Sequence, residues 1–213
     1  MNPKQQTLRV WLWMQKHWIV STLAFLIGSC AFMTRDRTVT WEEEVPLNTG
    51  ETVVVKRTGT YSLQLEAGNP FNVRLSPEPV STIEFTYKGK MYVYSGETGL
   101  LLLAIAPNGL PNLIADPRAH GWEWKNNFYC VVPYYLQLRP DSTGKQWDWQ
   151  EKIGPWLYGL PTNLIIGLAP LDADGKKYSK ADRILENGAR HSSEGHSRTI
   201  VSTYKFDSCK RKP

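Results

Sequence analysis

The sequence predicts a mostly β protein: an antiparallel β-sandwich or partly open barrel of hairpins, with one short helix near the C-terminus. Apolar and polar residues alternate with a period of two from residue 39 onward. Turn residues separate the apolar segments at short intervals, and helical spacing stands out in one place, after Ser179. Short strands separated by turns at regular intervals are typical of sandwiches and barrels.

The first predicted strands form a hairpin. Val39, Trp41, Glu43 and Val45 fall on one face of a strand, and after a turn at 47–51 a Val-rich segment returns at 52–57. This alternation indicates half-buried strands. Since residues 42–44 are all Glu, we expect an exposed strand edge kept soluble by charge. Gly and Pro at 68–70 and 76–79 predict a loop-rich stretch before alternation resumes at 83–87.

A second hairpin is predicted in the middle of the chain. Asn108-Gly109 separates two apolar segments, 100–106 and 110–115. An Asn-Gly pair between apolar segments is a strong hairpin signal, and the unbroken run of leucines predicts burial on both faces. Further strands are predicted at 122–124, 128–138, 147–149 and 199–206, with a turn at 141–144.

One short helix is predicted at 180–188. Ser179 and Asp182 have the spacing of a capping box, in which each side chain bonds the backbone of the other end of the first turn. Ala181, Ile184 and Leu185 follow at helical spacing, and Gly188 provides a stop. We expect this helix to pack on a sheet edge.

The N-terminal 29 residues predict a secretory signal. Lys4, Arg9 and Lys16 precede an apolar segment, and no acidic residue occurs among them. The segment ends in Ile27-Gly28-Ser29-Cys30. This ending resembles the lipobox of bacterial lipoproteins, and the chain as a whole is similar to uncharacterised β-rich lipoproteins of the Gram-negative envelope. The resemblance implies cleavage before Cys30 and acylation of that cysteine, which would anchor the protein to a membrane.

The resemblance also implies a domain organisation and a location. Residues 1–29 would be the signal peptide, 30–36 a tether and 37–213 a single β-rich domain. Ala31 follows the cysteine where Asp would favour retention at the inner membrane, so the outer membrane, facing the periplasm, is expected. The alternatives are an inner-membrane signal anchor, in which Cys30 is an ordinary thiol, and a cytosolic protein.

Composition bounds the partners and the redox state. Three of the 25 Lys and Arg residues lie in 1–29, which leaves 22 against 20 acidic residues, so a nucleic-acid partner is not expected. With Cys30 acylated, Cys130 and Cys209 remain as an even pair. In an oxidising compartment such a pair predicts a disulfide. The alternative is that Cys130 is a buried free thiol.

No constellation of catalytic residues or metal ligands was found in the sequence. Asp172-Ala173-Asp174-Gly175 begins like a calcium loop but lacks the later Glu, so we expect a polar turn. The spacing of His191 and His196 matches no zinc motif. No Gly-x-Ser-x-Gly motif is present. We therefore expect no catalytic residues, no metal and no cofactor.

The tryptophans are the one candidate binding surface in the sequence. Trp122 and Trp124 are two residues apart, as are Trp147 and Trp149, so each pair shares a strand face. Exposed, these faces could stack on a sugar ring or a peptide; the alternative is that they pack in the core.

These observations favour a membrane-anchored, non-enzymatic binding or structural module for an envelope protein or for peptidoglycan. One alternative is an envelope hydrolase that uses Asp and Glu beside the Trp faces. Another is an inhibitor or immunity-type lipoprotein.

Intact mass of the protein purified from membranes tests the predicted anchor. We expect a chain that begins at Cys30 and carries a lipid increment, because the lipobox peptidase cuts before an acylated cysteine. The variant Cys30→Ser should keep residues 1–29 and lack the increment. An unmodified mass for Met1–Pro213 in the unaltered protein would contradict the prediction.

Overall fold

The computed structural model describes residues 36–66, 69–117, 125–130, 135–150, 152–166, 172–191, 200 and 209–211. The chain divides into two compact units, one of Met1–Arg37 with Ser62–Ser76 and one of Thr38–Tyr61 with Pro77–Pro213. The core and the site described below belong to the second unit. The predicted signal peptide and Cys30 lie outside the described residues.

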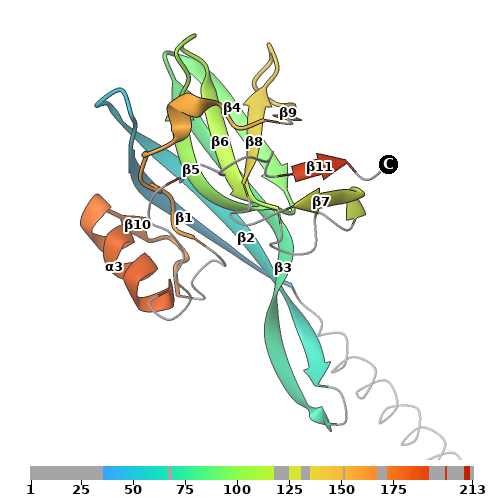
Figure 1. Cartoon of the computed structure of the whole chain (residues 1–213). Coiled ribbons are helices and arrows are strands. Elements are labelled where there is room, and N and C mark those ends of the chain that lie inside the picture. The colour runs from blue at the N-terminus through green and yellow to red at the C-terminus, as the bar shows by residue number, and fades with distance from the viewer. Residues whose placement is uncertain are drawn as a thin grey trace, which may run out of the picture. The chain divides into compact units, whose positions relative to one another are not determined.

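Three sheets are built from the described strands (Figure 1). A five-stranded sheet has the order β10 (Lys177–Tyr178), β1 (Arg37–Pro46), β2 (Thr52–Glu66), β3 (Asn69–Tyr87), β4 (Lys90–Gly96). A four-stranded sheet has the order β5 (Gly99–Ile105), β6 (Pro111–Asp116), β8 (Leu136–Pro140), β9 (Trp147–Gln150). A two-stranded sheet pairs β7 (Phe128–Cys130) with β11 (Cys209–Arg211). The described residues also form the helix α3 (Lys180–His191) and a short 3-10 helix, η2 (Pro155–Leu157).

The five-stranded and four-stranded sheets share one hydrophobic core. Val55, Ile83 and Phe85 of the first sheet pack in the same cluster as Leu103 and Leu113 of the second. Stacked sheets bury their facing apolar side chains in this way. The predicted fold class is therefore confirmed: mostly β and largely antiparallel, a sandwich with one short helix near the C-terminus.

The alternation predicted for β1 is confirmed, but the acidic edge is not. Val39, Trp41, Glu43 and Val45 are all buried, while Glu44 is exposed. Glu43 is 0% exposed, and β10 pairs in parallel with β1 at this point, so the strand is not an edge. The expectation of an exposed, charge-protected edge is wrong because residue 43 lies on the core face, where its carboxylate finds buried partners.

The β5–β6 hairpin around Asn108-Gly109 is confirmed, and β5 is buried on both faces. A register shift between Leu100 and Leu102 divides the strand. Leu100 and Leu103 therefore belong to the core between the sheets although they are three residues apart, while Leu102 belongs to a second cluster that includes Leu157. An extra residue in a strand changes which side chains face each side of the sheet. Burial on both faces explains the unbroken run of leucines.

The predicted loop at 68–79 is wrong where the structure describes it, because β3 runs from Asn69 to Tyr87. The described pairing of β3 with β4 begins at Ser81. Pro77 and Pro79 precede that point and are two residues apart, so their nitrogens face the same edge of the strand. Proline is tolerated in a strand where its nitrogen faces no ladder partner.

The predicted helix is confirmed and is longer than expected, from Lys180 to His191 instead of 180–188. Ser179 caps it: its Oγ accepts from the Asp182 N–H at 3.3 Å, and Asp182 Oδ2 accepts from the Ser179 N–H at 3.0 Å. The Ser179 hydroxyl, which donates to Asp182 Oδ2 at 2.6 Å, and the Ser179 N–H lower the pKa of Asp182. In the described part of the chain, no helix is both long and apolar enough to span a bilayer.

The backbone places Cys130 and Cys209 opposite each other. β7 and β11 are antiparallel, with Cys130 in register with Cys209. Directly opposite residues of antiparallel strands have Cα atoms about 4.5 or 5.5 Å apart. Disulfides bridge Cα separations of about 4.4–6.8 Å. The register therefore supports the predicted disulfide, which we retain as a proposal.

Thiol labelling tests the disulfide. In protein isolated from an oxidising compartment and denatured without reductant, we expect an alkylating reagent to label neither Cys130 nor Cys209. After reduction it should label both. The variant Cys130→Ser should leave Cys209 reactive without reductant. Labelling of both cysteines before reduction would contradict the pairing.

Candidate functional site

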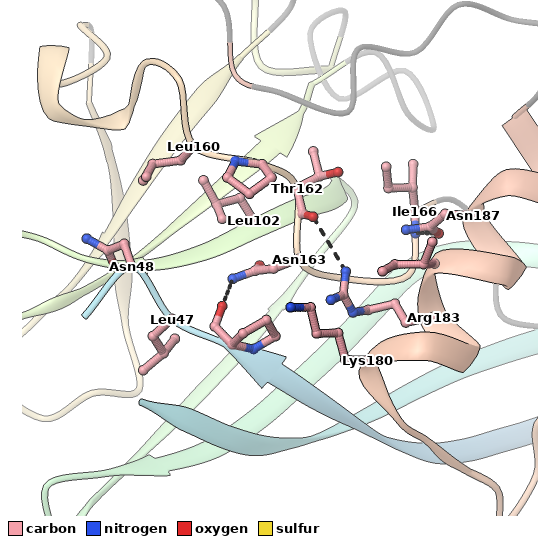
Figure 2. A pocket seen from close by; sticks show the side chains of 13 residues that line it. Leu47, Asn48, Leu102, Leu160, Thr162, Asn163, Ile166, Lys180, Arg183 and Asn187 are labelled. Atoms are coloured by element: carbon pink, nitrogen blue, oxygen red, sulfur yellow. Dashed lines mark hydrogen bonds between the residues drawn. The ribbon is translucent and has the colours of Figure 1, made fainter. Parts of the chain in front are cut away.

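A pocket of about 440 Å³ lies between α3, the segment 160–166 and the end of β1 (Figure 2). Its apolar lining consists of Pro46, Leu47, Leu102, Leu160, Pro161, Ile166 and Ile184, and its polar lining of Asn48, Thr162, Asn163, Lys180, Arg183 and Asn187. No Asp or Glu occurs in this described lining. The volume falls in the range of about 300–1,000 Å³ that is usual for small-molecule sites.

One face of α3 forms a wall of the pocket. Lys180, Arg183, Ile184 and Asn187 have the spacing i, i+3, i+4, i+7, which puts them in one row along a helix. Figure 2 shows the side chains of Lys180 and Arg183 extending from α3 toward Thr162 and Asn163. The wall thus presents two cations next to one apolar residue.

Asn163 fixes the opposite wall. It is buried, and its Oδ1 accepts from the Leu103 N–H at 2.8 Å. Its Nδ2 donates to the Leu103 carbonyl at 2.7 Å and to the Pro46 carbonyl at 2.8 Å. One side chain therefore joins β5 to the end of β1. The amide has both of its polar atoms engaged with backbone.

The other two asparagines of the lining are also backbone clamps. Asn48 accepts from the Ile105 N–H at 2.7 Å and donates to the Ile105 carbonyl at 2.8 Å. Asn187 accepts from the Ile166 N–H and donates to the Leu164 carbonyl, both at 2.9 Å. These amides take the place of a neighbouring strand, because each bonds a backbone N–H group and a backbone carbonyl that a strand would otherwise pair with. Lys180 and Arg183 are the charged groups that remain for a ligand in this described lining.

A buried ion pair lies next to this pocket. Glu43 Oε1 accepts from Trp41 Nε1 at 2.7 Å and from Arg57 Nη1 at 3.2 Å, and its Oε2 accepts from the Ile165 N–H at 2.8 Å. The guanidinium of Arg57 also stacks over the Trp41 ring at 5.3 Å. Burial lowers the pKa of Arg57, an effect that the charge of Glu43 and its hydrogen bond oppose.

Arg183 is a second buried cation near the same carboxylate. It is 3% exposed, and its Nη1 reaches the Thr162 carbonyl only at 3.5 Å. Its Nε has no hydrogen-bond partner in the described part of the chain. Burial lowers the pKa of Arg183, and the negative charge of Glu43 opposes this. Glu43 is therefore near two buried arginines, and the described lining of the pocket adds no further carboxylate.

The tryptophans predicted as a binding surface are described only in part. Trp147 and Trp149 are half-buried and pack against the core between the sheets. Trp147 Nε1 donates to the Val93 carbonyl at 2.7 Å, and its ring meets Tyr94 edge to face. These contacts favour the packing alternative for this pair. Trp122 and Trp124 lie outside the described residues.

Sequence reasoning did not find the pocket residues. The detectable signal was the row of Lys180 and Arg183 beside Ile184 in a capped helix. A second signal was a pair of opposite charges in the first predicted hairpin. Glu43 falls on the apolar face of one strand, and Arg57 ends the Val-rich strand that follows. His191 ends α3, and His196 lies outside the described residues.

Compared with known proteins, the chain matches no family model, no curated protein and no solved structure.

The substitution Glu43→Gln tests the buried ion pair. It leaves Arg57 without an anionic partner, and the amide NH₂ must face either the Ile165 N–H or the donors of Arg57 and Trp41. We expect a loss of about 3–5 kcal/mol in the free energy of unfolding, measured with urea. The exposed neighbour provides a control: Glu44→Gln should change stability by less than about 0.5 kcal/mol. Equal stability of the two variants would contradict this role of Glu43.

Proposed function

We propose that this protein is a lipid-anchored protein of the bacterial envelope whose β domain is a non-enzymatic binding module, and that the pocket beside α3 is its ligand site. The observation that carries the proposal is the pocket itself, which is about 440 Å³ in volume and mostly apolar, with two convergent cations. A concave apolar site with a few convergent polar groups is the usual form of a small-molecule site.

The chemistry of the pocket favours binding over hydrolysis. An envelope hydrolase would need acid and base groups that converge on a substrate. The described lining holds no carboxylate, and the nearby Glu43 is fully buried with both oxygens engaged. Lys180 and Arg183 are protonated donors. They can bind an anion, but in this form they cannot act as a general base.

The anchor is the second part of the proposal and rests on the sequence pattern that ends at Cys30. Acylation of this cysteine would hold the β domain at a membrane surface through a short tether. A module placed there would meet ligands of the envelope, at the periplasmic face of the outer membrane.

A protein partner is a second candidate function, favoured by exposed apolar residues on α3. Ile184 is 48% exposed and Leu185 is 72% exposed. Since Ile184 also lines the pocket, an apolar segment of another protein could cover the helix and enter the site. An inhibitor or immunity-type lipoprotein would use the surface in this way.

Titration with the neutral fluorescent dye Nile red tests whether the pocket binds ligands. We expect one saturable site in the mature domain. The variant Ile184→Trp places an indole at the pocket wall and should weaken binding by about tenfold or more, which corresponds to ~1.4 kcal/mol. Leu185→Trp adds the same group to the neighbouring exposed position, which does not line the pocket, and should bind as the unaltered protein does.

Absence of a saturable site would contradict the proposed function. So would equal affinity of the two Trp variants, because the dye would then be held elsewhere on the surface.

A further inference from the structure

We infer that the pocket beside α3 takes an amphipathic anion, with a carboxylate or phosphate head at Arg183 and an apolar body against Leu47, Leu102 and Leu160. The inference deepens the proposed function and rests on its assignment of this pocket as the ligand site. It follows from the charge balance of the buried groups, from the occupied amides and from the apolar lining.

The charge balance comes first. The carboxylate of Glu43 accepts hydrogen bonds from Trp41, Arg57 and the Ile165 backbone. Among the described residues, Glu43 is ion-paired with Arg57. Arg183 is 3% exposed, and in the described part of the chain its Nη1 makes a long hydrogen bond to the Thr162 carbonyl while its Nε has no partner. A buried guanidinium without a balancing anion is unfavourable, so an anion in the pocket would be stabilised there.

The polar groups of the lining favour an anionic ligand over a neutral polar one. The oxygen and the nitrogen of each asparagine amide, in Asn48, Asn163 and Asn187, already bond backbone groups. A sugar or another polyol needs acceptors as well as donors in its site. The charged groups left in the described lining are Lys180 and Arg183, which only donate. Such a set fits an acceptor with negative charge.

Arginine geometry favours a carboxylate or a phosphate. A guanidinium presents parallel N–H groups that match two oxygens of either head group. Figure 2 shows Arg183 directed into the pocket between Thr162 and Ile166, with Lys180 beside it. Lys180 is exposed and begins α3. The positive end of the helix dipole adds to the same field.

The rest of the pocket fits a hydrocarbon body. Leu47 and Leu102 are buried apolar residues of the lining, and Leu160, Ile166 and the two prolines extend this surface. The cations lie on the α3 side of the pocket, with apolar residues contributed by the other walls (Figure 2). This segregation of charged and apolar groups is the pattern expected for a ligand with one anionic end.

Calorimetry with ligands that share one chain and differ in head group tests the inference. We expect octanoate or octyl phosphate to bind the mature domain about tenfold or more tighter than octanol, because only an anion balances Arg183. The cation octylammonium should bind no better than octanol. Whichever of the two anions binds more tightly identifies the head group, and inorganic phosphate alone should bind weakly.

Substitution separates the role of Arg183 from general hydrophobic binding. Arg183→Met keeps the length of the side chain and should abolish the preference for the anion, while octanol binds as before. Arg139→Met is the matched control, because Arg139 is exposed and lies outside the pocket, and it should keep the preference. If Arg183→Met does not fold, Arg183→Lys should retain the preference for the anion with weaker affinity.

Equal binding of octanoate, octyl phosphate and octanol by the unaltered protein would overturn the inference. Binding of inorganic phosphate as tightly as octyl phosphate would also overturn it, since the site would then hold a free anion. If Nile red occupies the pocket and no octyl compound binds, the inference fails and the proposed function stands. If Nile red does not bind either, both fail.

Discussion

The carboxylate of Glu43 is the contact on which the site depends most. It bonds Trp41 of its own strand, Arg57 of β2 and the backbone of Ile165, which is 122 positions from Glu43 in the chain. Burying one charge in a β core is unfavourable unless it is paired and hydrogen-bonded, and here all of the described partners are donors. The segment 160–166, which forms part of the pocket wall, is held against β1 and β2 by this carboxylate, by Arg57, which donates to the Ile165 carbonyl at 3.4 Å, and by Asn163, which donates to the Pro46 carbonyl at 2.8 Å.

The same arrangement explains why the pocket is electrostatically unusual. Glu43 balances one arginine, and the fold places two near it. Asn163 and Asn187 bond the backbone around the pocket through both the oxygen and the nitrogen of their amides. The interior of a stable domain usually satisfies its buried polar groups, and exceptions concentrate at functional sites. Among the described residues, the Nε atoms of Arg57 and Arg183, which have no hydrogen-bond partner, are such exceptions, and of the two arginines Arg183 lines the pocket.

A local irregularity in β5 connects the core to the site. The register shift next to Leu101 directs Leu100 and Leu103 into the core between the sheets and Leu102 toward the pocket. The carbonyl of Leu101 then accepts from the Asn163 and Leu164 backbone N–H groups at 3.2 and 3.4 Å. β-Bulges that redirect one side chain are frequent beside functional sites. A regular strand would place Leu100 and Leu102 on one face and Leu103 on the other.

Local patterns in the sequence determined the elements, and the tertiary structure decided which of their polar residues matter. Alternation predicted the face of β1, Asn108-Gly109 predicted the β5–β6 turn, and Ser179 with Asp182 predicted the start of α3, because each depends on neighbours within a few residues. The strand at 69–79 was missed because proline and glycine punctuate the sequence there, and only strand pairing decides whether their backbone groups need partners. The burial of Glu43, the clamp of Asn163 onto Leu103 and the isolation of Arg183 arise between segments distant in the chain. The charge balance of an interior depends on which distant residues the fold brings together. For this reason only the tertiary structure decided which residues form the site.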